Sequence, residues 1–252
     1  MRKREIVLAV GAGAVAATLA GAILSGNDGP GRPMVAVNTS VEQTYELASF
    51  SRISTTGPQD VVVTHGDTQS VRGEGSLGRL DVVVENGELI IRPRNGGGWN
   101  WGDFDSTTLY VTVPELTRAS LNGSGDIRID NITGERFEAL LEGGFSGDFE
   151  INGLAVEEAE FTVNGPGDIS ASGTAESTRV TINGPGELKA GGLKSETATV
   201  MVRGPGDVEL AVEREADVSV DGPGEVDIDG PARCTISTSG PGSVSCGDQE
   251  SD

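Results

Sequence analysis

The chain has 252 residues and carries 39 acidic against 18 basic side chains, which gives a formal net charge of −21 at pH 7. This charge repels nucleic acids and anionic lipid surfaces and attracts cationic ligands or divalent ions, so we expect no nucleic-acid partner. Aromatic residues make up only 4% of the chain, which suits a slim core better than a wide globular one.

An apolar segment opens the chain. Residues 6–24 are nineteen residues without a charge, and three basic residues stand at positions 2–4. As a helix this segment spans about 28 Å, close to the thickness of the bilayer core. We therefore expect residues 1–24 to be an apolar helix, either a signal peptide that is cleaved near Ala20-Gly21-Ala22 or a retained membrane anchor. The basic residues should stay in the cytoplasm, which predicts a periplasmic or envelope-associated body.

Residues 25–46 lack a hydrophobic period and are rich in Gly and Pro at their start, so they are expected to form a linker. A first coil of β-structure is expected at residues 50–63, with a corner at Gly57-Pro58. Residues 80–84 and 89–91 alternate apolar and polar side chains and continue the strand pattern. Asn86-Gly87 between them favours either a two-residue corner or a local hairpin.

A glycine-rich interruption at residues 94–105 contains both tryptophans of the protein. Trp99, Trp101 and Phe104 could form a binding tip, because tryptophan anchors contacts and stacks on sugars. Alternatively, these aromatic side chains fold back and cover an exposed wall or edge of the domain. Both interpretations stay open.

One phrase, Gly-Pro-Gly followed by an acid, recurs from about residue 119 to residue 246. It is complete at 165–168, 184–187, 204–207 and 222–225, and weaker copies end at Asp126, Asp148 and Ser243. Six steps cover 117 residues, about 19.5 each. A fixed period near twenty indicates a solenoid. Proline presets φ of the first central turn residue and the next glycine supplies φ > 0, which predicts a type II turn.

Stacking the copies on the acid reveals apolar columns one and three residues after it and five and seven residues before it. A column of small residues stands nine before the acid: Ala139, Ala159, Thr178, Ala198, Ala216 and Cys234. This alternation predicts an all-β, single-stranded parallel β-helix over residues 47–247, followed by an acidic tail at 248–252. A propeller blade needs roughly 40 residues, and an antiparallel meander would place its turns at alternate ends.

The acid column is the most unusual feature of the repeat, and its members are Asp126, Asp148, Asp168, Glu187, Asp207 and Glu225. Stacked carboxylates repel one another and need protonation, splay or counterions. The functional hypothesis is weak Ca²⁺ binding by their oxygens. The structural alternative is that each acid accepts a turn N–H or faces solvent as a guard against sheet aggregation. Asn122, Asn164 and Asn183, four residues before the acid, could form an amide ladder.

The two cysteines, Cys234 and Cys246, both lie in the last coil. An exported chain with two thiols this close is expected to form one disulfide, here across the lumen of the final coil, where it would plug the open end. A redox-active role has little support, since the spacing is not that of a CxxC site.

Catalytic motifs are sparse. His65 is the only histidine and lies in an expected turn without a paired nucleophile motif, so we expect a surface histidine. The acids repeat along the axis instead of gathering on one coil with basic residues, as a polysaccharide-cleaving site would need. We therefore expect no enzyme and no cofactor beyond weakly bound Ca²⁺.

The arrangement resembles the “putative auto-transporter adhesin, head GIN domain” family of bacterial exported proteins over roughly residues 45–247. The resemblance rests on Tyr45-Glu46-Leu47-Ala48-Ser49-Phe50 leading to Gly57-Pro58-Gln59-Asp60-Val61, on Gly87-Glu88-Leu89-Ile90-Ile91, on Tyr110-Val111-Thr112-Val113-Pro114, on Asn122-Gly123-Ser124-Gly125-Asp126-Ile127, and on the coils down to Cys246. It implies a right-handed β-helix and an adhesin, and it brings no catalytic residues. Relatives often carry Gly-Ser-Gly-Asp where this chain has Gly-Pro-Gly, which stiffens the corners.

These features together favour an exported, non-enzymatic envelope protein that presents an acidic surface to an envelope or surface ligand. A membrane contact through the amino-terminal segment is expected if that segment is not cleaved. A polysaccharide-acting β-helix enzyme and a purely structural spacer are the alternatives.

Overall fold

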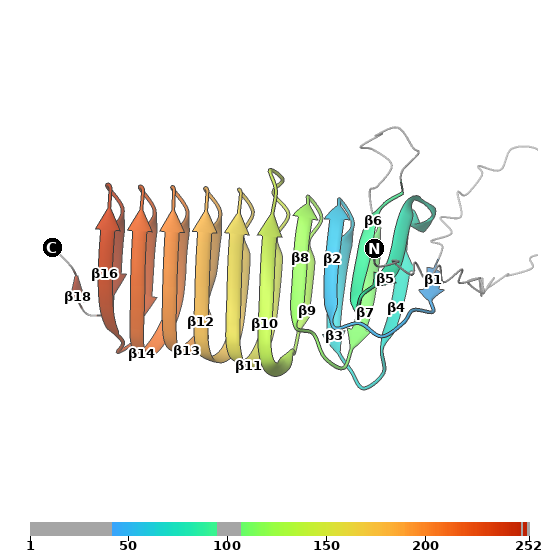
Figure 1. Cartoon of the computed structure of the whole chain (residues 1–252), viewed down its shortest axis with the longest axis horizontal. Helices are drawn as coiled ribbons and strands as arrows, with labels where there is room; N and C mark the ends of the chain where they lie inside the picture. Colours follow the sequence, from blue (N-terminus) through green and yellow to red (C-terminus); the bar gives the residue numbers. More distant parts are fainter. Residues whose placement is uncertain (1–41, 95–106, 248, 251–252) are drawn as a thin grey trace, which may run out of the picture.

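The computed structural model describes residues 42–94, 107–247 and 249–250, and over these residues the protein is a β-solenoid of about six turns. The coils stack along one long axis, with β1 near one end and β16 and β18 at the other (Figure 1). The only helical element in the described ranges is a 3-10 turn at Leu77–Arg79, and no described helix has the length and apolarity needed to cross a membrane. The expected apolar helix at residues 6–24 lies outside these ranges.

The strands fall into an irregular amino-terminal set and a regular carboxyl-terminal set. The first set is β1 (Glu42–Tyr45), β2 (Arg52–Gly57), β3 (Asp60–His65), β4 (Ser70–Glu74), β5 (Leu80–Glu85), β6 (Glu88–Pro93), β7 (Thr108–Val113), β8 (Arg118–Gly123) and β9 (Ile127–Asp130). The second is β10 (Thr133–Glu142), β11 (Phe149–Asn164), β12 (Ile169–Asn183), β13 (Glu187–Arg203), β14 (Asp207–Asp221), β15 (Glu225–Asp229), β16 (Arg233–Ser239), β17 (Ser243–Cys246) and β18 (Gln249–Glu250).

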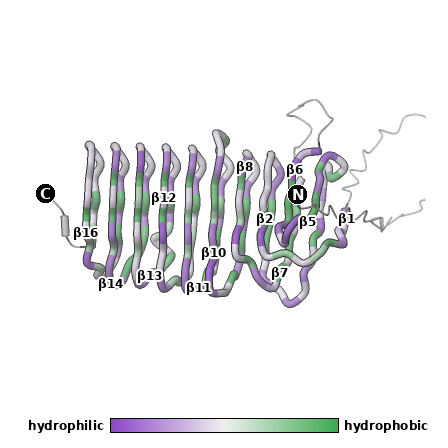
Figure 2. Tube along the Cα trace, viewed as in Figure 1, coloured by the Kyte–Doolittle hydropathy of each residue, from purple (hydrophilic) through white to green (hydrophobic). Residues whose placement is uncertain are grey.

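The regular coils stack in parallel and in the register that the repeat predicts. One column of paired residues runs Phe161, Val180, Val200, Val218 and Ile236. The small-residue column pairs position by position from Ala159 to Cys234. Its expected first member does not follow this register: Ala139 pairs with Phe161, and Phe137 pairs with Ala159, because the segment before Asp148 is two residues longer than in the later coils. The predicted parallel β-helix is therefore confirmed, and all of its inward apolar columns are buried up to the last coil. Figure 2 shows the alternation of hydrophobic and hydrophilic residues along the strands.

Each complete coil has three inward-facing segments, which β11 illustrates. Its buried side chains alternate at Phe149 and Ile151, resume at Leu154 and Val156, and resume again at 159, 161 and 163. The two breaks in alternation turn the strand while keeping apolar side chains toward the axis, because side chains of a strand alternate between its two faces. The lumen is consequently filled along its length by one continuous core.

The corners differ from the predicted type II turn. The positive φ belongs to the glycine before the proline, as at Gly165 (134°) and Gly184 (119°), and the glycine after it has no positive φ. The second glycine is instead required by close stacking. A Cβ on Gly186 would lie 2.4 Å from the carbonyl oxygen of Gly167 and 2.6 Å from Cγ1 of Val163. The predicted positive φ therefore belongs to the first glycine of the corner and not to the second. The second glycine is needed because the adjacent coil lies too close for a Cβ atom.

The amino-terminal layers do not follow chain order. Strand β2 lies between β6 and β8, and β3 lies between β7 and β9, all in parallel. Strands β5 and β6 form an antiparallel hairpin with Asn86 (φ 52°) and Gly87 (φ 75°) at its turn. The hairpin alternative is thus confirmed, and the corner alternative is wrong. The chain moves outward past β2 and β3 and then returns to continue the solenoid.

Antiparallel strands cover the amino-terminal end. Strand β4 pairs with β7, and β1 pairs with β4. Residues 42–45, within the stretch expected to be linker, therefore form part of this cover. Antiparallel strands of this kind end a stack of parallel coils, because they occupy the strand edge with which a further parallel coil would form backbone hydrogen bonds.

Candidate functional site

The acid column lies beside the Gly-Pro-Gly corners, and its aspartates bind the backbone of the next coil. The Oδ1 atom of Asp148 accepts a hydrogen bond from the amide of Asp168 at 2.9 Å, and Asp168 accepts one from the amide of Glu187 at 3.1 Å. Three more pairs make the same contact: the backbone amides of Asp126, Asp148 and Glu225 donate to the carboxylates of Asp60, Asp126 and Asp207, respectively. Asp60 is therefore a further member of the column, which the Gly57-Pro58 corner could have indicated.

The two glutamates of the column lack this contact. The amide of Ser243, which follows Glu225 in the stack, donates instead to the carbonyl oxygen of Gly224 at 3.2 Å. Glu187 is paired with Lys189, whose Nζ lies 2.9 Å from its carboxylate and 3.1 Å from that of Asp168. Both carboxylates help to raise the pKa of Lys189 through hydrogen bonds. One cation thus offsets the repulsion between neighbouring acids at this step.

The surroundings of Asp126 raise the pKa of its carboxyl group. Desolvation of its carboxylate raises its pKa, and the carboxylates of Asp60 and Asp148 raise it further, while the hydrogen bond from the amide of Asp148 acts in the opposite direction. Within the described residues, no three His, Cys, Asp or Glu side chains converge as metal ligands. The column geometry shows a backbone-binding role for its aspartates.

The asparagine row is only partly formed. The side-chain amide of Asn183 donates to Oδ1 of Asn164 at 2.8 Å. Glu142 pairs with Asn164 on the other side, so it separates Asn164 from Asn122. The ladder therefore consists of two rungs.

An exposed ridge runs along the corners, and sequence reasoning did not single it out. Its members are exposed and stand one per coil: Ser124, Phe145, Pro166, Pro185, Pro205, Pro223 and Pro241. Phe145 is 47% exposed, the one large hydrophobic side chain in the described ranges with such exposure. We name this set the corner ridge. It places small apolar surfaces directly beside the acid column.

A groove crosses four coils on the segment that follows the acid-bearing strand. It has a volume of about 500 Å³. Glu157, Glu176, Glu196 and Glu213 line it together with Lys194 and small residues, and all five charged side chains are exposed. Arg214 pairs with Glu196 at 3.0 Å. The sequence signal for this groove was a glutamate that recurs eight or nine residues after the column acid in several coils.

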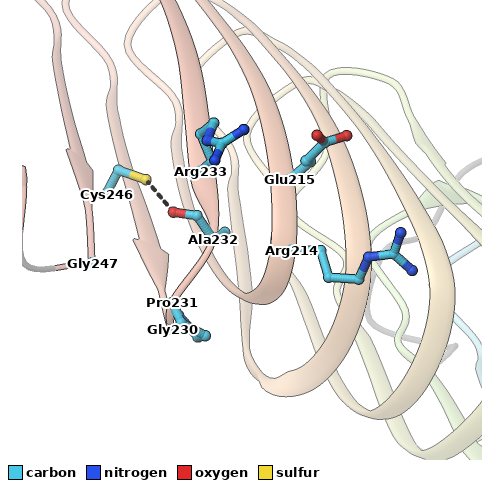
Figure 3. A pocket seen from close by; sticks show the side chains of 8 residues that line it. All are labelled: Arg214, Glu215, Gly230, Pro231, Ala232, Arg233, Cys246 and Gly247. Carbon is cyan, nitrogen blue, oxygen red and sulfur yellow. Dashed lines mark hydrogen bonds between the residues drawn. The ribbon is translucent and has the colours of Figure 1, made fainter.

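A second hollow, of about 660 Å³, lies at the carboxyl-terminal end between β14, β16 and β17. Figure 3 shows Arg214, Glu215 and Arg233 around it. Cys234 and Cys246 are joined by a disulfide with their Cα atoms 6.4 Å apart, which links β16 to β17 across the last coil. The Sγ atom of Cys246 lies 3.6 Å from the carbonyl oxygen of Ala232. In the disulfide this sulfur has no hydrogen to donate, so the approach is a packing contact.

Two further parts of the sequence were predicted as candidate sites: His65 and the aromatic residues of the glycine-rich segment. His65 ends β3 and is exposed. Trp99, Trp101 and Phe104 lie outside the described residues.

Comparisons with known proteins agree with the fold. A crystal structure of a “putative adhesin” from Bacteroides fragilis has a TM-score of 0.76 at 21% identity, over 82% of this chain and 97% of that one. A “putative lipid binding protein” from Parabacteroides distasonis has a TM-score of 0.66 at 19% identity, over 83% and 97%. A “putative adhesin” from Parabacteroides distasonis has a TM-score of 0.61 at 18% identity, over 82% and 96%. No curated protein matches this chain.

The family model described as “Putative auto-transporter adhesin, head GIN domain” matches residues 49–232. This range begins just before β2 and ends just before β16, so it contains the acid column, the groove and all of the corner ridge except Pro241. The chain belongs to the family of putative auto-transporter adhesins with a head GIN domain.

Proposed function

We propose that the protein is an exported, non-enzymatic binding module of the cell envelope, in which the solenoid presents an acidic surface to an envelope or surface ligand. Membership in an adhesin family supports binding over catalysis. The apolar segment at residues 6–24 supports export. The ligand class favoured by the charge is cationic or divalent-ion-bridged.

The observation that carries this proposal is that many carboxylates of the solenoid already have structural partners. In the acid column the aspartates hold backbone amides of the next coil, and several outward carboxylates pair with basic side chains. A hydrolytic site needs acids freed from such structural partners and gathered around one reacting atom. Rows of identical groups along a rod instead suit a repetitive ligand, because each coil offers the same contact one strand spacing further on.

Retention of envelope components by the immobilised protein tests the proposal. Two variants are compared with the native protein: one lacks residues 95–104, and the other carries Phe145→Ser on the corner ridge. Specific retention that falls with either change would support a binding module and would also identify the surface used. If the protein retains nothing from the envelope fraction under low and physiological salt, the binding proposal is wrong and the structural spacer is favoured.

A polysaccharide-acting enzyme is the second candidate, and the groove with four glutamates and Lys194 is what favours it. Its glutamates come one from each coil and are exposed, whereas a glycosidase holds one acid in a desolvated pocket. Release of reducing ends or unsaturated products from acidic and neutral polysaccharides, lost in Glu176→Gln, would establish this activity. We expect no release.

A further inference from the structure

We infer that the carboxyl-terminal tip of the solenoid pairs with the same tip of a second copy, through antiparallel pairing of β16 with its two-fold mate. This inference rests on the proposed function and names a partner for it, namely another molecule of this chain.

The two ends of the rod are finished differently. At the amino-terminal end β1, β4 and β5 add antiparallel strands to both walls. At the other end, β18 pairs with β17 only at Ser245 and Cys246. Among the described strands, β16 pairs with β14 alone, so its seven residues form an open edge at the tip (Figure 1).

The direction of the open backbone groups follows from one contact. The carbonyl oxygen of Ser239 accepts a hydrogen bond from the amide of Gly222 on the β14 coil, at 2.9 Å. Because backbone groups of alternate residues in a strand point to opposite sides, Cys234, Ile236 and Thr238 direct their N–H and C=O groups away from β14. These are donors and acceptors that a further strand can pair with.

The last coil also lacks the acidic side chains found in the other coils, and the one charged residue of β16 is Arg233 at its start. Residues 230–247 contain no Asp or Glu, in a chain with a net charge of −21, and Ser243 replaces the acid of the column. Charged side chains on edge strands are a common protection against edge-to-edge pairing. A pair made through β16 therefore brings no Asp or Glu of residues 230–247 into contact, although Glu250 of β18 lies on the neighbouring strand β17. This lowers the charge repulsion between two acidic chains at β16 itself.

The sequence of β16 is suited to pairing with itself. In an antiparallel pair centred on Ile236, this residue meets its own mate on the inner side, and Thr235 meets Ser237 of the other copy on the outer side. Ile236 is the last member of an inward column and is only partly buried. Pairing would continue the core from one rod into the next, which favours a second copy over an unrelated strand.

The amino-terminal ends would then lie at the two far ends of the dimer (Figure 1). If the residues before β1 hold each copy at a membrane, tip-to-tip pairing joins molecules that face each other from opposing surfaces. This is the geometry of a homophilic contact, and its two-fold symmetry closes it at two copies.

Sedimentation of the full chain in mild detergent tests the pairing. Thr235→Lys combined with Ser237→Lys places like charges opposite one another twice in the dimer. Thr235→Lys combined with Ser237→Glu places opposite charges there and differs at one position only. We expect a concentration-dependent mass of two chains for the native protein and a dissociation constant at least about tenfold weaker for the Lys/Lys than for the Lys/Glu variant.

Both variants should melt within a few degrees of the native protein, since the two side chains point outward from the last coil. A mass of one chain at every concentration, a mass that grows beyond two chains, or equal dissociation constants for the two variants would overturn the inference. Association through the amino-terminal segment is separated by the same comparison, because it does not respond to residue 237. The measurement uses pure protein, so it stands independently of any envelope ligand.

Discussion

At the residue scale, the molecule depends on a polar contact between neighbouring coils that recurs wherever the column acid is an aspartate. A buried or partly buried backbone amide needs an acceptor, and the coil corner leaves one amide at the start of each strand. Aspartate has the right length to supply that acceptor from the coil below, as Asp148 does for Asp168. The column is therefore an arrangement for holding corners in register, at the expense of placing like charges next to one another.

Asp126 makes this conflict measurable. Its raised pKa means that the folded state binds a proton more readily than the unfolded state, so the stability that this group contributes is present at low pH and is lost as pH rises through its folded-state pKa. Asp126→Asn keeps the acceptor for the amide of Asp148 and removes the charge. We expect a higher Tm than the native protein at pH 7 and a smaller difference near pH 3, by thermal melting.

The control for this prediction is Asp126→Ala, which removes both the charge and the acceptor. It should be less stable than Asp126→Asn at pH 7 by about 1 kcal/mol, the usual net contribution of one hydrogen bond. Equal melting temperatures for the two variants would mean that the acceptor contributes nothing to the corner.

The second glycine of each corner is required by packing. Gly186→Ala places a methyl group 2.4 Å from the carbonyl oxygen of Gly167, and relief of this overlap must separate two coils. We expect a loss of about 1–3 kcal/mol in the free energy of unfolding, measured by denaturant titration. Gly144→Ala is the matched control, because nothing lies within 4 Å of its Cβ position; comparable losses in both would point to backbone entropy instead.

At the element scale, the extent of correct prediction follows the regularity of the repeat. The inward columns from Ile127 to Cys246 were predictable, because a period near twenty with alternation inside it leaves one way to stack the side chains. The layer order at the amino terminus was not predictable, because β2 pairs with β8 across 60 residues of chain that also form strands. Local patterns do not state which strand lies beside which.

The candidate site was predicted in the same uneven way. The acid column and its structural alternative could be read from spacing, but the neighbour that each carboxylate contacts lies in another coil. The corner ridge and the groove were missed because they combine residues of several coils into one surface. Their signals were present in the aligned copies: a proline two residues before the acid, and a glutamate eight or nine residues after it in several coils.

The last coil tests how locally a solenoid responds to change. The disulfide closes a separation of 12 residues, which in the chain-entropy account contributes up to about 3 kcal/mol. Replacing both cysteines by serine should raise amide hydrogen exchange in β16 and β17 and leave β9 and β10 unchanged, since each coil contacts only its neighbours. A uniform rise along the whole rod would instead show that the solenoid unfolds as one unit.

At the scale of the whole molecule, the net charge of −21 destabilises the compact state, because like charges repel one another. Salt should screen this repulsion and stabilise the fold. We expect Tm to rise by several degrees between 0.05 and 0.5 M NaCl.

Comparison of CaCl₂ with MgCl₂ at equal ionic strength separates screening from specific binding. Because the aspartates of the column already hold backbone amides through Oδ1, the two divalent salts should give the same Tm. An excess shift with Ca²⁺ that disappears in Asp148→Asn would assign the column to calcium, since the amide side chain keeps the acceptor but loses the charge that a hard cation needs.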